Sequence, residues 1–125
     1  MIMPRILIID DDDLIRQMLR DVLEREGYDV ADASDGKQGL RVFMENPADM
    51  VVTDLVMPEK EGIEIIMELR RDFPELKIIA ISGGGTVGGG QYLAVAGKLG
   101  ADKILGKPLK LRQFVTIVKD LLGND

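Results

Sequence analysis

Two hydrophobic patterns alternate along this chain. Short runs of consecutive apolar residues, such as Ile6-Leu7-Ile8-Ile9, are typical of strands that are buried on both faces. Between these runs, apolar residues recur every three or four positions, which is the spacing of one face of a helix. We therefore predict strands at residues 5–9, 28–33, 50–53, 77–81 and 103–105. We predict helices over residues 14–23 with an end at Gly27, from Asp35 to before Asn46, over 63–70 with an end before Pro74, over 92–99 and over 111–122.

Strand and helix thus alternate five times, a pattern that favours a parallel sheet covered by helices on both faces. We predict a doubly wound, flavodoxin-like α/β fold, in which the five strands, numbered along the chain, lie in the order 2-1-3-4-5. The 125 residues suit one domain, so we expect a single domain over 1–125 and no separate output domain. In such sheets the ligand site lies outside the carboxyl ends of the strands.

Charged or reactive residues follow four of the five predicted strands. Asp10 and Asp11 follow the first strand, Asp54 the third, Ser82 the fourth and Lys107 the fifth. Because the carboxyl ends of parallel strands meet at one edge, we expect these side chains to lie together. Carboxylates about 4 Å apart repel by roughly 4 kcal/mol per pair at an effective dielectric of about 20, and a divalent cation such as Mg²⁺ would offset that repulsion. If Asp54 attacked a phosphoryl group, Lys107 and Ser82 would be suitable donors to its oxygens.

Each of these residues also has an ordinary structural explanation when it is taken alone. One or two acids of the run Asp10–Asp13 are explained by capping of a helix N-terminus. Asp54 suits a turn, Ser82 a turn or a cap, and Lys107 a solvated surface position or the start of a helix before proline. Their joint placement at one edge of the sheet favours a functional site.

Composition narrows the possible chemistry. The chain contains no histidine and no cysteine, so chemistry here depends on carboxylates, hydroxyls, lysines and backbone groups. The net charge of −6 and the lack of a basic stripe argue against binding to nucleic acid. No apolar run approaches the roughly 20 residues of a membrane span, and no signal-peptide pattern is present, so we expect a cytoplasmic protein with no membrane partner.

The motifs resemble, in order and spacing, those of the response-regulator receiver family (CheY-like) of two-component signalling. The resemblance covers the whole chain and is specific only as a combination of motifs. It rests on Ile8-Ile9-Asp10-Asp11, on Asp54 followed by Leu55-Val56-Met57-Pro58, on Ser82 after Ile79-Ala80-Ile81, and on Lys107-Pro108.

The resemblance implies that Asp54 is the phosphoacceptor, which receives a phosphoryl group from a sensor histidine kinase or phosphotransfer protein. It implies a switch with self-catalysed transfer and autodephosphorylation, not an enzyme with a separate substrate. Output would pass to an unknown downstream protein by protein contact.

The resemblance also implies the roles of the surrounding residues. Asp11 and Asp54 would bind Mg²⁺ directly together with the Val56 carbonyl, and Asp10 would act through water. Ser82 and Lys107 would contact the phosphoryl group, and the Lys107-Pro108 peptide would be cis.

Two features depart from the family pattern. Ile104 stands where receivers usually carry Tyr or Phe, whose ring changes rotamer when the hydroxyl residue moves, so the switch pair here would be Ser82 and Ile104. The segment Gly83–Gly90 is rich in glycine, which raises the entropy lost when a loop becomes ordered. We expect this loop to become ordered around a bound phosphoryl group, and the alternative is a passive connector.

Three other functions fit parts of the sequence. A small haloacid-dehalogenase-like phosphatase would use Asp10 as nucleophile and Asp12 as acid, but that reading leaves Asp54 without a role. A receiver-like binding module without phosphorylation would need neither Asp54 nor Lys107. The glycines at 83, 85 and 88 match a dinucleotide-binding pattern, but they follow the fourth predicted strand and not the first strand of a unit.

Overall fold

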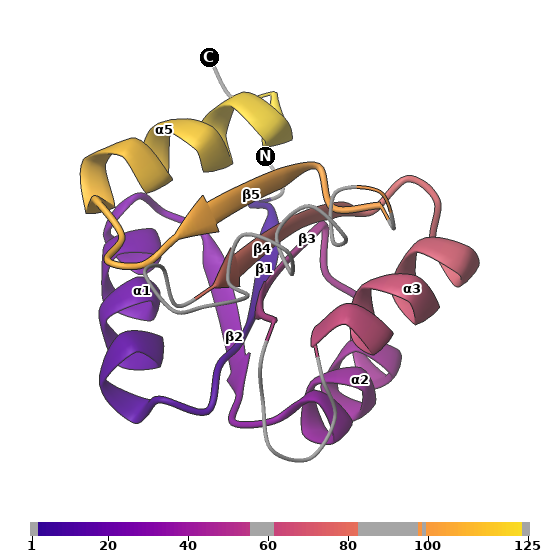
Figure 1. The fold of residues 1–125 in the computed structure, drawn as a ribbon. Coiled ribbons are helices and arrows are strands. Elements are labelled where there is room, and N and C mark those ends of the chain that lie inside the picture. The colour runs from indigo at the N-terminus through magenta and orange to yellow at the C-terminus, as the bar shows by residue number, and fades with distance from the viewer. Residues whose placement is uncertain (1–2, 56–61, 83–97, 99, 124–125) are drawn as a thin grey trace.

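The computed structural model describes residues 3–55, 62–82, 98 and 100–123. Strands and helices alternate through most of these residues, as Figure 1 shows. The elements are β1 (Arg5–Ile9), α1 (Asp13–Arg25), β2 (Asp29–Ala33), α2 (Gly36–Glu45), β3 (Met50–Asp54), α3 (Gly62–Asp72), β4 (Lys77–Ser82), β5 (Lys103–Gly106) and α5 (Leu111–Leu122). The helix predicted at 92–99 and the segment Gly83–Gly90 lie outside the described residues, apart from Lys98.

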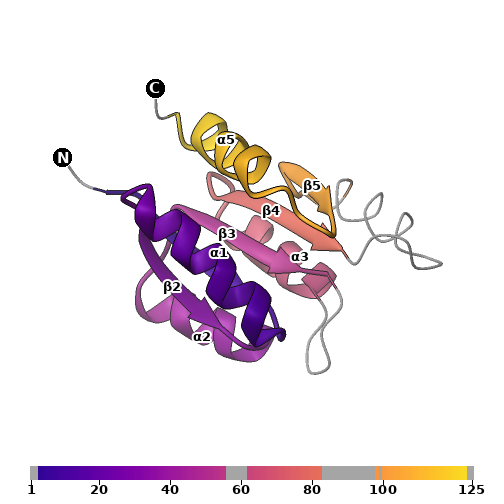
Figure 2. The same ribbon diagram turned by 90° about the vertical axis from the view of Figure 1, so that its left-hand side faces the viewer.

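The five strands form one parallel sheet in the order β2-β1-β3-β4-β5, which confirms the predicted fold. Helices α1 and α5 cover one face of the sheet, and α2 and α3 cover the other (Figure 2). The register pairs Asp54 with Ile81 and Ser82 with Gly106. The carboxyl ends of β3, β4 and β5 therefore reach the same rim of the sheet.

The core has two halves, one on each face of the sheet. On β1, Leu7 and Ile9 pack with residues of α2 and α3, whereas Ile6 and Ile8 pack with residues of α1 and α5. Successive side chains of a strand point to opposite faces, so a strand covered on both sides needs an unbroken apolar run. Burial of each such side chain stabilises the fold by about 1.5–3 kcal/mol, which holds the ends of β1 and β3 in fixed positions.

Capping residues set where the helices begin and end. Asp12 caps α1 by accepting two backbone N–H groups of the first turn, and Asp35 caps α2 in the same way through one. After α1 the chain turns at Gly27, whose φ of 94° lies in the left-handed region. The Tyr28 N–H donates to the Leu23 carbonyl at 3.2 Å, so Tyr28 belongs to the turn that follows α1, and β2 begins one residue later than predicted.

Three strands extend one residue beyond their apolar runs. The apolar pattern predicted ends at Thr53, Ile81 and Leu105, but the strands continue to Asp54, Ser82 and Gly106. The ladder continues beside Asp54 because the Leu55 N–H donates to the Ile81 carbonyl at 2.9 Å. The backbone of Asp54 and Ser82 is thus held by the sheet itself.

Gly62 allows α3 to begin directly against the end of β3. A Cβ at this position would collide with the Asp54 carbonyl oxygen and would lie 2.7 Å from Leu55 Cα. We expect Gly62→Ala to lower the free energy of unfolding by about 1–3 kcal/mol, because backbone atoms must shift. Urea denaturation would measure the change. Gly106→Ala is the control, since no described atom lies within 4 Å of its added Cβ. Equal stability of the two variants would contradict this account.

Candidate functional site

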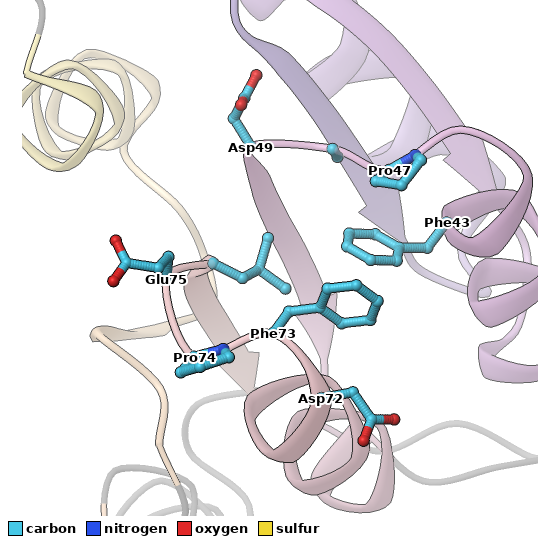
Figure 3. Close-up of a pocket in the computed structure, with 9 residues that line it drawn as sticks. Phe43, Pro47, Asp49, Asp72, Phe73, Pro74 and Glu75 are labelled. Atoms are coloured by element: carbon cyan, nitrogen blue, oxygen red, sulfur yellow. The ribbon is translucent and has the colours of Figure 1, made fainter.

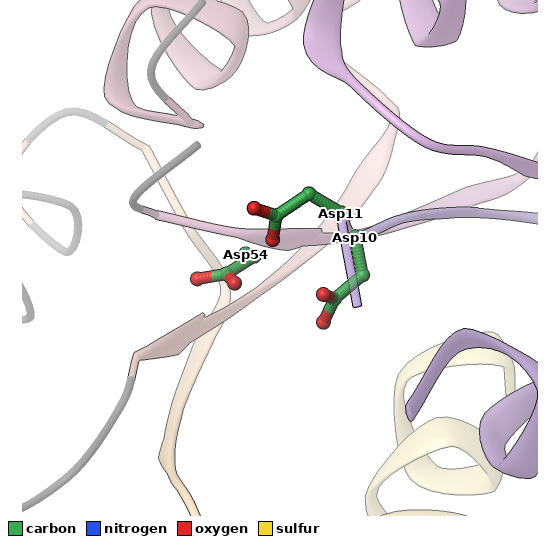
Figure 4. Close-up of side chains that lie close together, drawn as sticks. All are labelled: Asp10, Asp11 and Asp54. Atoms are coloured by element: carbon green, nitrogen blue, oxygen red, sulfur yellow. The ribbon is translucent and has the colours of Figure 1, made fainter. Parts of the chain in front are cut away.

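Three carboxylates lie together at the carboxyl rim of the sheet. Asp10 and Asp11 directly follow β1, and Asp54 ends the neighbouring strand β3. One oxygen from each residue lies within 4.8 Å of the other two, and Figure 4 shows the three side chains gathered at these strand ends. Asp10 and Asp54 are 1% and 6% exposed, whereas Asp11 is exposed to solvent. The prediction that these three acids lie close together is confirmed.

Lys107 brings a positive charge to the same place from the other side of the rim. Its Nζ lies 3.1 Å from Asp54 Oδ2 and 3.5 Å from Asp10 Oδ2. The Lys107-Pro108 peptide is cis, and the Lys107 N–H donates to the Ser82 carbonyl at 2.7 Å. The backbone of Lys107 is therefore tied to the end of β4 while its side chain reaches the carboxylates.

Among the described residues, one lysine, Lys107, contacts these acids. Burial raises the pKa of the Asp10 carboxyl, and the charges of Asp54 and Asp11 act in the same direction. The Asp12 N–H and Lys107 only partly offset these effects. Burial alone would lower the pKa of Lys107, but the attraction of Asp54 and Asp10 outweighs it and raises that pKa. Among the described residues, the negative charge of the carboxylates thus exceeds the positive charge that contacts them.

Asp10 Oδ2 shows where further positive charge would fit. It is buried and has no hydrogen-bond partner among the described residues, whereas Oδ1 accepts the Asp12 N–H at 2.9 Å. A buried carboxylate oxygen that accepts no hydrogen bond is unfavourable, and a cation closer than the Lys107 ammonium at 3.5 Å would satisfy it. Clustered carboxylate oxygens suit a hard cation such as Mg²⁺. The donor set of Asp10, Asp11 and Asp54 therefore fits the predicted metal.

The remaining predicted site residues fall into three cases. Ser82 ends β4 at the same rim, as expected, and the structure buries it. Ile104 lies partly buried in β5 opposite Ala80, and its part in a switch stays a prediction. Val56, the predicted carbonyl ligand, lies outside the described residues.

The four acids after β1 have two different roles: Asp10 and Asp11 belong to the cluster, and Asp12 and Asp13 belong to the start of α1. Asp12 Oδ1 accepts the N–H groups of Leu14 at 2.9 Å and Ile15 at 3.2 Å, so this residue caps α1. Asp13 lies in the first turn of the helix, where negative charge is favourable. Because Asp12 is engaged in the cap, the structure offers no support for its use as the acid of a phosphatase.

Sequence reasoning missed Arg16. Its Nη1 donates to the backbone carbonyl of Asp10 at 2.8 Å, and its Nη2 pairs with Asp13 at 2.6 Å. The spacing of three residues between Asp13 and Arg16 signals a helical ion pair. It gives no sign of the contact to the carbonyl, which depends on how the chain turns between β1 and α1.

A hollow of about 360 Å³ lies at the opposite edge of the sheet, between the ends of α2 and α3 (Figure 3). Phe43 and Phe73 line it with their rings edge to face, 4.8 Å apart between centroids. Asp49 and Leu76, which also line it, directly precede β3 and β4. This hollow adjoins the amino ends of the strands, so it is separate from the acidic rim.

A second groove, of about 350 Å³, adjoins the acidic rim. It is mainly apolar and is lined by Ile15, Met18, Lys107, Pro108 and Leu109. The groove therefore runs from α1 to the connection between β5 and α5, and Lys107 forms part of its wall.

Comparison with known proteins decides the family. The sequence model of the response regulator receiver domain matches residues 6–119. The chain belongs to this family. Receiver domains are phosphoacceptor signalling switches of two-component systems, and as a family they bind Mg²⁺ at an acidic pocket and interact with histidine kinases and downstream effectors. The three carboxylates at the rim correspond to such a pocket.

Relatives of this receiver domain include parts of longer signalling proteins. It is 37% identical over 118 residues to the transcriptional regulatory protein SrrA of Staphylococcus aureus, covering 94% of this chain and 47% of SrrA. It is 34% identical over 119 residues to the sensor kinase CckA of Brucella abortus, covering 94% of this chain and 12% of CckA. The chain thus spans less than half the length of either relative.

Solved structures agree with the fold. The crystal structure of a response regulator receiver domain protein from Clostridium thermocellum superposes with a TM-score of 0.88 at 32% identity, covering 97% of this chain and 95% of that one. Within the described part of the receiver domain, no helix has the length and apolar character that crossing a membrane requires.

Removal of charge at Asp10 tests whether the site is short of positive charge. Because the raised pKa of Asp10 means that the folded protein disfavours its ionised form, we expect Asp10→Asn to stabilise the metal-free domain by about 0.5–2 kcal/mol at neutral pH. Thermal unfolding in the presence of a chelator would measure this. Asp12→Asn is the matched control, since Asn caps a helix about as well as Asp, and we expect little change. A less stable Asp10→Asn variant would contradict the inference.

Proposed function

We propose that Asp54 is the residue that accepts the phosphoryl group, with Lys107 and Ser82 as donors to the phosphoryl oxygens. The observation that carries this proposal is the position of the Asp54 carboxylate, which lies between the Lys107 ammonium at 3.1 Å and the acids that follow β1. The positive charge of Lys107 would stabilise the negative charge on the phosphoryl oxygens, which the Asp54 carboxylate alone cannot do.

Asp10 is a poorer nucleophile than Asp54 in this arrangement. Its Oδ1 accepts the Asp12 N–H, and its Oδ2 has almost no accessible surface. The phosphorus atom must reach the attacking oxygen, and the side chain of Asp10 is 1% exposed whereas that of Asp54 is 8% exposed, so Asp54 is the more accessible of the two. This supports the receiver assignment over the phosphatase alternative.

The transfer is a displacement at phosphorus. One oxygen of Asp54 forms a bond to the phosphorus of a phosphohistidine as the P–N bond breaks, and the released imidazole takes up a proton. Lys107 and the Ser82 hydroxyl donate to the equatorial oxygens, where charge is spread in the transition state. The ligands proposed for Mg²⁺ are Asp11, Asp54 and the Val56 carbonyl, and Asp10 would act on the ion through water. When bound, Mg²⁺ neutralises charge on the phosphoryl oxygens.

The resting contacts suggest how phosphorylation alters the surface. Formation of an acyl phosphate on Asp54 places a phosphoryl group beside Lys107, so the 3.1 Å ion pair must rearrange. The Lys107 N–H is bonded to the Ser82 carbonyl, which joins the ends of β4 and β5. A shift of Ser82 towards the phosphoryl group would therefore also move the chain around Ile104. Ser82 and Ile104 are the proposed switch pair.

The partner that supplies the phosphoryl group is proposed to be a protein, a histidine kinase or phosphotransfer protein. Leu14, at the start of α1, is 77% exposed, and the apolar groove along Ile15 and Met18 leads to Lys107. An apolar surface beside a reactive site suits a protein donor better than a small one. Output through contact with a downstream protein, and not through nucleic acid, remains part of the proposal.

The identity of the phosphoacceptor is tested by labelling with phosphoramidate, a small donor with a P–N bond. We expect Asp54→Asn to abolish Mg²⁺-dependent labelling, because the amide is not nucleophilic. Asp10→Asn should still be labelled, more slowly, since it retains the acceptor. Intact-protein mass spectrometry would follow both. Loss of labelling in Asp10→Asn with full labelling of Asp54→Asn would instead support the phosphatase alternative.

The role of Lys107 is tested separately. We expect Lys107→Met to slow labelling by about 10²-fold, because a positioned donor to the transition state is lost. Lys110→Met is the control, since Lys110 is an exposed lysine three residues away that makes no capping contact through its side chain. The same labelling assay at saturating Mg²⁺ gives the comparison. If both variants were labelled at the wild-type rate, Lys107 would have no part in transfer.

A further inference from the structure

Arg16 is the side chain of α1 that reaches back to the acidic rim. Its Nη1 donates to the Asp10 carbonyl at 2.8 Å, its Nη2 to Asp13 at 2.6 Å, and its Nε lies 3.6 Å from Asp32 Oδ1. The guanidinium thus faces three acceptors, and only 18% of the side chain is exposed. None of the three acceptors is a side-chain oxygen of Asp10, Asp11 or Asp54, the acids of the proposed metal site.

The outer end of this contact is anchored on the sheet. Asp32 lies in β2 opposite Ile8 of β1, and its other oxygen accepts from Arg20 Nη1 at 2.7 Å. Asp32 is therefore held by two arginines of α1, one turn apart, and of these two Arg16 also contacts Asp10, whereas Arg20 pairs with Glu24. The contact to Asp10 therefore gives Arg16 a place in the acidic site, whereas the contact to Asp32, which both arginines share, serves to dock α1 on the sheet.

We propose that Arg16 is a positioning residue for the Mg²⁺ site, which it serves by fixing the peptide that joins Asp10 to Asp11. This inference rests on the proposed function, in which both acids hold the metal. The Asp10 N–H donates to the Ala33 carbonyl of β2 at 3.2 Å, and its carbonyl accepts from Arg16. Asp10 is thus held through its backbone on both sides, from β2 and from α1.

The consequence for Asp11 follows from peptide geometry. The Asp10 carbonyl and the Asp11 nitrogen belong to one planar unit, so holding the carbonyl also fixes the direction in which the chain enters Asp11. Asp11 is the exposed member of the three acids and lacks the burial that restrains Asp10 and Asp54. Mg²⁺ requires near-ideal octahedral geometry, so a small rotation of this peptide would weaken binding.

The effect of Arg16 is expected to come from its shape and not from its charge. Two carboxylates, Asp13 and Asp32, flank the guanidinium and neutralise it locally. A rigid fork of donors can serve three acceptors at once, whereas the ammonium of a lysine is a compact point charge. Arg16→Lys should therefore keep the ion pairs of α1 but lose the hold on the Asp10 carbonyl.

The test compares Arg16→Met and Arg16→Lys with Arg20→Met in the full chain. Arg20 lies on the same helix and shares Asp32, so its replacement controls for loss of a cation and of helix docking. Calorimetric titration with MgCl₂ would give the dissociation constant of each variant. We expect the Mg²⁺ dissociation constant to rise about tenfold in Arg16→Met and at least about fivefold in Arg16→Lys. In Arg20→Met it should rise less than about threefold.

A second readout separates positioning from loss of structure. At saturating Mg²⁺, phosphoramidate labelling of Arg16→Lys should return to near the wild-type rate, while the Mg²⁺ concentration for half-maximal labelling should rise in step with the dissociation constant. A structural role alone would instead lower the unfolding temperature of Arg16→Lys and leave its Mg²⁺ affinity unchanged. Unchanged affinity in Arg16→Lys, or an equal rise in Arg16→Met and Arg20→Met, would overturn the inference. Arg16→Lys supplies the answer even if Arg16→Met fails to fold.

The outcomes distinguish this inference from the proposed function. If the wild-type protein bound no Mg²⁺, or were not labelled at Asp54, the proposed function would fail and the inference with it. If the wild-type protein bound Mg²⁺ and were labelled at Asp54 while the Arg16 variants behaved like Arg20→Met, only the positioning role would be wrong.

Discussion

Repulsion among three carboxylates is the constraint on which the rest of the site depends. Asp10, Asp11 and Asp54 converge within 4.8 Å, and among the described residues Lys107 is the one lysine that contacts them. A buried Asp10 oxygen without a hydrogen-bond partner makes the imbalance local. The resting site is therefore less stable than it would be with additional positive charge, which is the property that suits it to a cation.

The fold can maintain this unfavourable cluster because the backbone beneath it is fixed by the sheet. β1 and β3 are neighbouring central strands with apolar side chains packed on both faces, and Asp54 is itself part of the ladder. Gly62 lets α3 start against the end of β3, while Arg16 holds the carbonyl of Asp10. Hydrophobic burial far from the site thus offsets electrostatic repulsion within it.

Much of this arrangement could be predicted from the sequence because it follows from topology. Alternating runs and periodic segments indicated a parallel sheet, and the residues after the strands, Asp10, Asp54 and Lys107, then had to share one rim. Contacts that depend on the path of a turn could not be predicted in this way. The donation from Arg16 to Asp10 joins a helix side chain to a backbone carbonyl across the connection between β1 and α1, and no periodicity encodes it. Strand ends were also set too early, because the apolar pattern stops at the last apolar residue whereas the ladder continues.

The most direct test of the central claim is chemical mapping of the acyl phosphate on the unaltered protein. After phosphoramidate treatment with Mg²⁺, borohydride reduces an aspartyl phosphate to homoserine, and peptide mass spectrometry locates the changed residue. The account predicts homoserine at position 54 and not at positions 10 or 11. Conversion at position 10, or no conversion at any aspartate, would contradict it.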